Sequence, residues 1–110
     1  MKKLLLVAAL MLLTVSVADA SDLIFVDDNS FVENGYKYVQ GTIRNGGDKV
    51  IKVVTITVKF YDGAGKFLRF AQTFANPAYL LPGHEGFYEV SVPEDPDIKV
   101  HTIHADYELE

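Results

Sequence analysis

One short segment near the C-terminus carries side chains that could hold a metal ion. His104, Asp106 and Glu108 alternate with Ala105 and Tyr107, so on a β-strand the three polar side chains project from one face in steps of about 6.5–7 Å. Imidazole and carboxylate groups bind zinc and other divalent metals. We therefore predict His104 and Asp106 as candidate metal ligands, with Glu108 as a third. The alternative is the solvated polar face of a half-exposed strand.

Other polar residues are weaker candidates for a catalytic or metal-binding role. His84 and Glu85 could form an acid–base pair or a solvated turn, and His101 points to the opposite face of its strand from His104 because three is an odd spacing. Residues 27–29 (Asp-Asp-Asn) offer oxygens to calcium, but the EF-hand spacing is absent, so we expect a bulge or turn. Patterns typical of serine hydrolases, P-loops, dinucleotide binding and zinc proteases are also absent. The chain is therefore predicted not to be an enzyme.

Tyrosines offer a different kind of surface. Tyr36, Tyr38, Tyr61 and Tyr88 are candidates to reach the solvent side of the sheets, where aromatic rings stack on sugars or dock partners. The alternative is cross-strand packing, for which Tyr is well suited. A carbohydrate-binding module using Tyr36 and Tyr38 is thus one hypothesis, although the chain has no Trp.

Length and composition limit the classes of protein. The 110 residues allow one domain. The net charge of −5 argues against nucleic-acid binding, which needs clustered Lys and Arg. Without Cys there are no disulfides, thiolate zinc sites, iron–sulfur clusters or thiol nucleophiles. We expect neither a cofactor nor a nucleic-acid partner.

The N-terminus has the layout of a secretory signal peptide. Two lysines precede an apolar run over residues 4–17, and small residues occupy the −3 and −1 positions of a cut after Ala20. A membrane-spanning helix needs about 20 apolar residues, so we interpret 1–20 as a cleaved signal peptide and 21–110 as the domain. Cleavage leaves 8 basic and 14 acidic residues, a net charge of −6. The mature protein is expected to be soluble and extracytoplasmic, in the periplasm or secreted, with no transmembrane segment.

Apolar residues in the remaining chain recur with a period of two, which predicts strands rather than helices. In residues 50–62, the side chains of Val54, Ile56, Val58 and Phe60 share one face. The other predicted strands are 22–27 (resuming at Phe31 and Val32), 36–45, 66–75, 86–92 and 98–109. Their predicted inward residues are Val39, Gly41 and Ile43; Leu68, Phe70 and Phe74; Tyr88, Val90 and Val92; and Ile103, Ala105, Tyr107 and Leu109.

Turn residues separate these strands. Asn34-Gly35 predicts a two-residue hairpin. Gly41 has no side chain to pack, so a bulge or a close backbone approach is expected there, and Phe87 is out of phase with its strand, which suggests a twist or bulge. Six or seven short strands with turns between them predict an all-β, antiparallel β-sandwich.

Three segments of the chain resemble the FxLYD domains of secreted and envelope-associated bacterial and archaeal proteins: 38–47, 54–66 and 81–87. The motif that names the family falls on residues 58–62, where Val58 and Phe60 replace its Phe and Leu and Tyr61-Asp62 are kept. Plant-type water-stress domains share a similar sandwich and are a competing resemblance. The FxLYD resemblance covers residues 22–110 and implies an immunoglobulin-like sandwich of about seven strands without catalytic residues. Asp62 and Asn45 are expected to accept hydrogen bonds in their own turns.

Taken together, these features predict a secreted, non-catalytic β-sandwich module that interacts with an envelope protein or a cell-wall glycan. A divalent-metal-binding protein using His104 and Asp106, and a carbohydrate-binding module using the tyrosines, are the alternatives.

Overall fold

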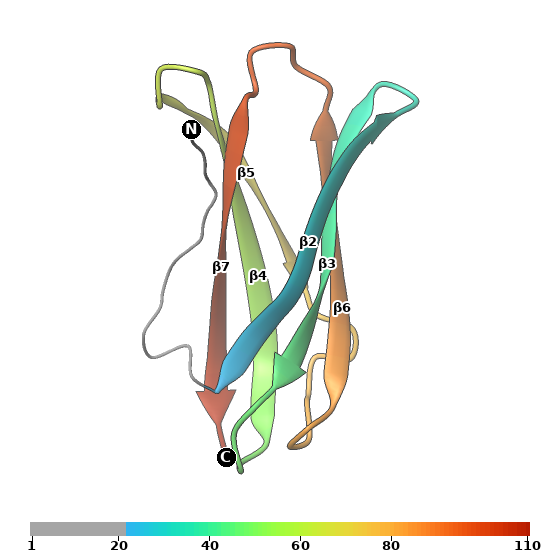
Figure 1. Ribbon diagram of the computed structural model, residues 1–110, viewed down its shortest axis with the longest axis vertical. Coiled ribbons are helices and arrows are strands. Elements are labelled where there is room, and N and C mark those ends of the chain that lie inside the picture. The colour runs from blue at the N-terminus through green and yellow to red at the C-terminus, as the bar shows by residue number, and fades with distance from the viewer. Residues whose placement is uncertain (1–21) are drawn as a thin grey trace.

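Six antiparallel strands make up the part of the chain that the computed structural model describes, residues 22–110 (Figure 1). The strands are β2 (Leu23–Glu33), β3 (Tyr36–Asn45), β4 (Ile51–Tyr61), β5 (Phe67–Phe74), β6 (Glu85–Pro93) and β7 (Val100–Leu109). The signal peptide predicted for residues 1–20 lies outside this range. Residues 22–110 contain no helix long and apolar enough to cross a membrane.

The strands form two three-stranded sheets, in the orders β2-β3-β6 and β5-β4-β7. The predicted all-β sandwich is confirmed, with six strands in the described range rather than about seven. These strand orders match those of immunoglobulin-type sandwiches. In that nomenclature β2, β3 and β6 correspond to strands A, B and E, and β5, β4 and β7 correspond to strands C′, C and F.

The core lies between the two sheets and follows the predicted alternation. Val54, Ile56, Val58 and Phe60 on β4 are all fully buried, because β4 is the central strand of its sheet and one of its faces meets the other sheet. Val39 and Ile43 on β3, with Tyr88, Val90 and Val92 on β6, form the opposing layer. Burying each such side chain contributes about 1.5–3 kcal/mol.

The turns follow the residue types that predicted them. Asn34 and Gly35 have φ angles of 54° and 82°, as a two-residue hairpin between twisted strands requires. The carboxylate of Asp62 accepts hydrogen bonds from the amides of Ala64 (2.9 Å) and Lys66 (2.8 Å). The turn after β4 is therefore held by the side chain at its start.

Asn45 joins three segments at the end of β3. Its fully buried amide donates to the carbonyls of Lys49 (2.7 Å) and Leu80 (2.8 Å), and its Oδ1 accepts from the amide of Gly47 (2.9 Å). The hydrogen bond from the Gly47 amide within the turn was predicted. The hydrogen bond to Leu80 was not, because it joins residues 35 apart in the sequence.

Among residues 22–110, backbone hydrogen bonds bridge the two sheets on one side of the sandwich, and no isolated β-bridge joins them on the other. Asn76 and Leu80, in the segment between β5 and β6, pair with Phe87 and Ile51 respectively, so this segment bonds to both sheets. On the other side, β2 and β7 are the edge strands (Figure 1). There Phe25, on the inward face of β2, stays 37% exposed.

Of the twist or bulge predicted at Phe87, the bulge is wrong. β3 and β6 pair without a register shift, and Phe87 simply faces outward, 46% exposed. The irregularity of this sheet lies on β2, between Phe25 and Asp27. Asp28 of β2 pairs with Gly41, where a bulge or close approach was expected.

Candidate functional site

Three phenylalanines with exposed rings lie on one side of β5. Phe67, Phe70 and Phe74 are 48%, 57% and 63% exposed. All three lie on the outer side of the β5-β4-β7 sheet, and the ring of Phe67 packs edge-on against Tyr61 at 6.0 Å. These four side chains are called the β5 aromatic face below.

The inward orientation predicted for Phe70 and Phe74 is wrong, and a bulge is the reason. Tyr61 pairs with Phe67 but Phe60 pairs with Arg69, which leaves Leu68 as an extra residue on β5. Leu68 packs against the core, and beyond it the alternation is reversed. Arg69, Ala71 and Thr73 therefore lie opposite the buried face of β4.

An ion pair accommodates the charge of Arg69 on the inward side of β5. Its guanidinium reaches the carboxylate of Asp95 at 3.0 Å, and both side chains are partly exposed. The ion pair joins β5 to the loop between β6 and β7.

Polar side chains continue the same outer surface beyond β5. Gln72 donates to the hydroxyl of Thr57 at 2.9 Å, and Thr57 pairs on its other side with His104 of β7. A shallow hollow of about 260 Å³ lies beside Phe74, lined by Thr55, Gln72, Thr73 and Phe74.

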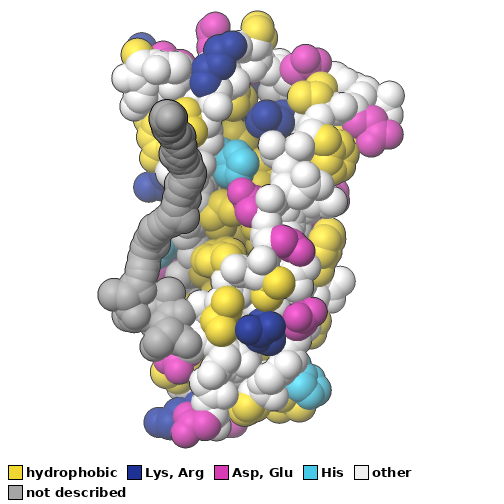
Figure 2. Space-filling model, viewed as in Figure 1, with side chains coloured by type: hydrophobic (Ala, Val, Ile, Leu, Met, Phe, Trp, Pro, Cys, Tyr) yellow, Lys and Arg dark blue, Asp and Glu magenta, His cyan; other side chains and the backbone are white. Residues whose placement is uncertain are grey.

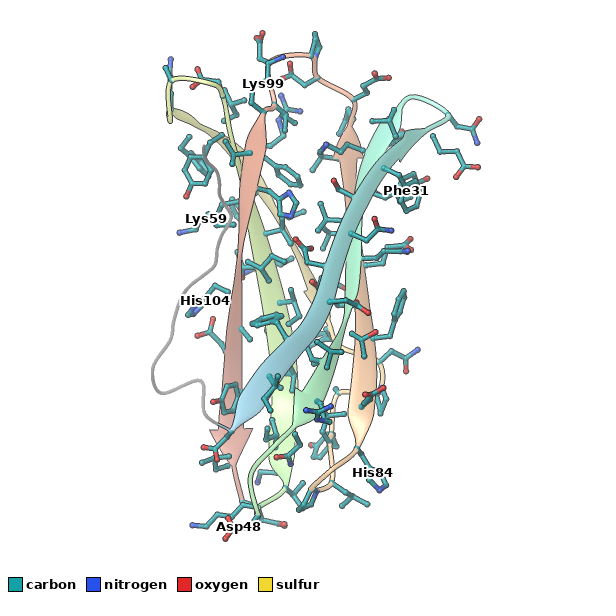
Figure 3. All side chains as sticks on the ribbon, in the orientation of Figure 1. Phe31, Asp48, Lys59, His84, Lys99 and His104 are labelled. Carbon is teal, nitrogen blue, oxygen red and sulfur yellow. The ribbon has the colours of Figure 1, made fainter. Side chains whose placement is uncertain are left out.

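The predicted metal candidates lie on the outward face of β7. His104 Nε2 is 3.0 Å from Asp106 Oδ1, and the two side chains are 67% and 70% exposed. Figure 3 shows His104 projecting from β7 to the side away from β2. In residues 22–110, no group of three or more His, Asp or Glu side chains is close enough to hold a metal ion. The pair supplies two of the four ligands that zinc usually takes, and the metal site stays a prediction.

The candidate acid–base pair (His84 and Glu85) and the candidate calcium segment (residues 27–29) lie on other elements than the metal candidates of β7. His84 lies in the loop that leads into β6 (Figure 3) and is exposed, as is Glu85. In residues 27–29, Asp27 accepts from the backbone amide of Thr42 at 2.9 Å. That carboxylate holds the bulged part of β2 against β3.

An unpredicted contact connects the two sheets on their open side. His101 of β7 donates from Nε2 to Asp28 Oδ2 of β2 at 2.8 Å, and the hydroxyl of Tyr88 on β6 donates to Asp28 Oδ1 at 3.3 Å. The ring of His101 also packs against Phe60 at 6.2 Å. The sequence placed His101 opposite to His104, but its partner Asp28 lies 73 residues away in the chain.

Burial and the Asp28 carboxylate both act on Tyr88. The residue is 1% exposed. Its predicted inward position on the strand with Val90 and Val92 is therefore confirmed, and its alternative solvent-facing position is wrong. Burial raises the pKa of Tyr88 far above its usual value, and the nearby negative charge of Asp28 adds to the effect. Its hydroxyl therefore stays protonated and serves as a donor.

Gly41 makes room for this tyrosine. A Cβ atom at position 41 would lie 2.5 Å from Tyr88 Oη and 2.8 Å from Cζ, and would also collide with the carbonyl oxygen of Asp27. The close approach predicted for Gly41 is confirmed, and it is made by a side chain as well as by backbone.

Two tyrosines lie on the outer face of the other sheet. Tyr36 is 47% exposed. Tyr38 is stacked on Phe31 with ring centroids 5.0 Å apart and planes 12° from parallel. One face of the Tyr38 ring is thus covered by cross-strand packing. The carbohydrate-binding role of Tyr36 and Tyr38 stays a prediction.

Comparison with known proteins supports the fold. No protein-family model matches the chain, and no curated protein matches it. The structure is similar to the crystal structure of a DUF1425 family member from Shewanella sp. pv-4, with a TM-score of 0.57 over 78% of each chain and 14% sequence identity. At this identity the likeness shows the β-sandwich fold alone. The resemblance to FxLYD domains stays a prediction.

Proposed function

We propose that this chain is a non-catalytic binding module that acts outside the cytoplasm and docks an envelope protein through the β5 aromatic face. The observation that carries the proposal is the exposure of three phenylalanines on one side of one edge strand. Several exposed aromatic side chains on one face of a small domain are typical of interaction sites. Aromatic side chains are also enriched where proteins bind proteins.

Two further features support this function. The signal-peptide pattern of residues 1–20 is the basis for proposing an extracytoplasmic location. The resemblance to FxLYD domains favours a binding module, because the matching residues Asn45 and Asp62 hold turns rather than a reaction centre.

Site-specific photo-crosslinking in cells tests the proposal. A photoreactive phenylalanine analogue is placed at Phe70, at Phe74 and, as a matched control, at Phe87, which is similarly exposed on the outer face of the other sheet. We expect one protein to be captured from positions 70 and 74 and not from position 87. The same adducts at all three positions, or none at 70 and 74, would contradict the docking surface.

The compartment needs its own measurement. We expect the protein from cell-envelope or culture-medium fractions to begin at Ser21, as determined by mass spectrometry of its N-terminal peptide. An intact N-terminus in the cytoplasmic fraction would contradict the proposed location.

A further inference from the structure

Among residues 22–110, β7 is an edge strand of its sheet, and it has few of the features that protect edge strands from pairing. On β2 the bulge after Phe25 and the inward carboxylate of Asp28 disturb the edge, β6 carries the bridge to Asn76, and β5 has the inward charge of Arg69. Such devices discourage pairing with another chain. Residues 102–109 of β7 contain no Pro, Gly or Lys, and the irregularity in the β4–β7 pairing is an extra residue on β4.

The inward side chains of β7 are also incompletely covered. Ile103 and Ala105 are only partly buried, whereas the residues that pair with them on β4, Val58 and Ile56, are fully buried. Figure 2 shows hydrophobic side chains exposed along the middle of the face that lies between β7 and β2. A further strand beside β7 would remove this apolar surface from water.

We propose that β7 pairs antiparallel with β7 of a second copy of this chain, about a two-fold axis that passes through Ala105. The sheets of the two copies then join into one sheet of six strands. In this register, four kinds of pair face each other besides the two Ala105 residues: His104 with Asp106 of the second copy, Thr102 with Glu108, Ile103 with Tyr107, and His101 with Leu109.

This register is self-complementary on the outer face of the sheet. On the outer face, each imidazole or hydroxyl donor lies opposite a carboxylate, and directly opposed side chains interact most strongly in antiparallel pairs. On the inner face, Ile103 meets a tyrosine, the small Ala105 meets itself, and His101, whose imidazole is bonded to Asp28 of its own chain, meets Leu109. Because a two-fold axis repeats every contact, each favourable pair occurs twice.

Shifting the pairing of the two β7 strands by one or two residues removes these favourable pairs. A shift by two residues in one direction places Asp106 opposite the same carboxylate of the second copy, which is destabilising. A shift in the other direction places two His104 side chains together and Val100 opposite Glu108. A shift by one residue would put polar side chains opposite the apolar face.

Pairing of two strands of this length buries less surface than a stable interface needs, so the dimer is a weak one that forms with rising concentration. The proposal does not depend on the β5 aromatic face, which lies on the opposite edge strand of the same sheet. The tests below therefore leave that surface unchanged.

Disulfide trapping tests the register, because the chain has no cysteine of its own. Thr102→Cys and Glu108→Cys variants are oxidised separately and as a mixture. In the proposed register, position 102 of one copy and position 108 of the other have Cα atoms about 4.5–5.5 Å apart, within disulfide range. Two residues at position 102 are instead about 20 Å apart. We expect the mixed dimer to form several-fold faster than either homodimer. Equal rates in all three samples, or no disulfide dimer, would overturn the proposal.

Exchanging the side chains at positions 104 and 106 tests the proposed β7–β7 pairing without a covalent bond. Sedimentation equilibrium in EDTA, which removes any bridging metal, is expected to show a concentration-dependent dimer for the wild-type chain. His104→Asp should lose it because two carboxylates then face each other, and the double variant His104→Asp, Asp106→His should restore it. His84→Asp, with the same charge change at an exposed loop, is the control. A monomer at every concentration, or a His104→Asp variant that dimerises like the control, would refute the interface.

Discussion

Replacement of Gly41 by alanine should destabilise the domain, because the space for a methyl group is already filled. The new Cβ would lie 2.5 Å and 2.8 Å from two atoms of the Tyr88 side chain and would collide with the backbone of Asp27. Tyr88 is buried and its hydroxyl is held by Asp28. The ring therefore cannot move aside without losing other contacts.

Two opposing effects determine the size of the change. Overpacking a filled site costs about 1–3 kcal/mol, and a clash with backbone belongs at the upper end. Alanine also restricts the unfolded chain, which stabilises by about 0.4–1 kcal/mol. The net loss in free energy of unfolding for Gly41→Ala is therefore expected to be about 2 kcal/mol. For a domain of this size, this corresponds to a fall in Tm of roughly 8–16 °C.

Urea unfolding followed by circular dichroism measures this loss, with thermal unfolding as a second assay. Gly63→Ala is the matched control, since its Cβ would meet only the side chain of Lys99 at 3.6 Å, an ordinary contact. If Gly41→Ala stays within about 0.5 kcal/mol of the wild type, as ordinary surface substitutions do, the packing of Tyr88 over Gly41 is refuted.

Three further predictions concern other parts of the sandwich. Tyr88→Phe should change how stability depends on pH. The pKa of Tyr88 is raised in the folded protein, whereas the tyrosine of the unfolded chain ionises above about pH 10. The free energy of unfolding of the wild type should therefore fall by up to about 1.4 kcal/mol per pH unit above that pH. The variant should lack this fall in unfolding experiments, whereas Tyr36→Phe should keep it. Asn45→Ala should cost about 2–4 kcal/mol because it leaves buried carbonyl groups without donors, with exposed Asn29→Ala as the control. Phe70→Ala should change the free energy of unfolding by no more than about 0.5 kcal/mol and Phe60→Ala by about 3–5 kcal/mol; similar losses would contradict the outward orientation of Phe70.

Much of the fold was predictable from the sequence because it depends on neighbours along the chain. The alternation of β4 shows which of its side chains are buried, and Asn34-Gly35 specifies a hairpin through its backbone conformations. The outward position of His104 and Asp106 follows from the same period of two.

The β5 aromatic face was not predictable in this way. A single extra residue, Leu68, reverses which side chains of β5 face the core, and nothing in the local pattern distinguishes a bulged strand from a regular one. The sequence pattern therefore assigned Phe70 and Phe74 to the core, whereas the pairing with β4 exposes them.

Residue types and their spacing are enough to define the set of strands, the turns between them and the two faces of most strands. Which strands pair, and in which register, depends on the packing of the two sheets. The contact of His101 with Asp28, and of Tyr88 with Asp28 and Gly41, brings together residues from four strands of both sheets. Such contacts depend on how two sheets pack, because side chains far apart in the chain become neighbours only when the core between them is filled.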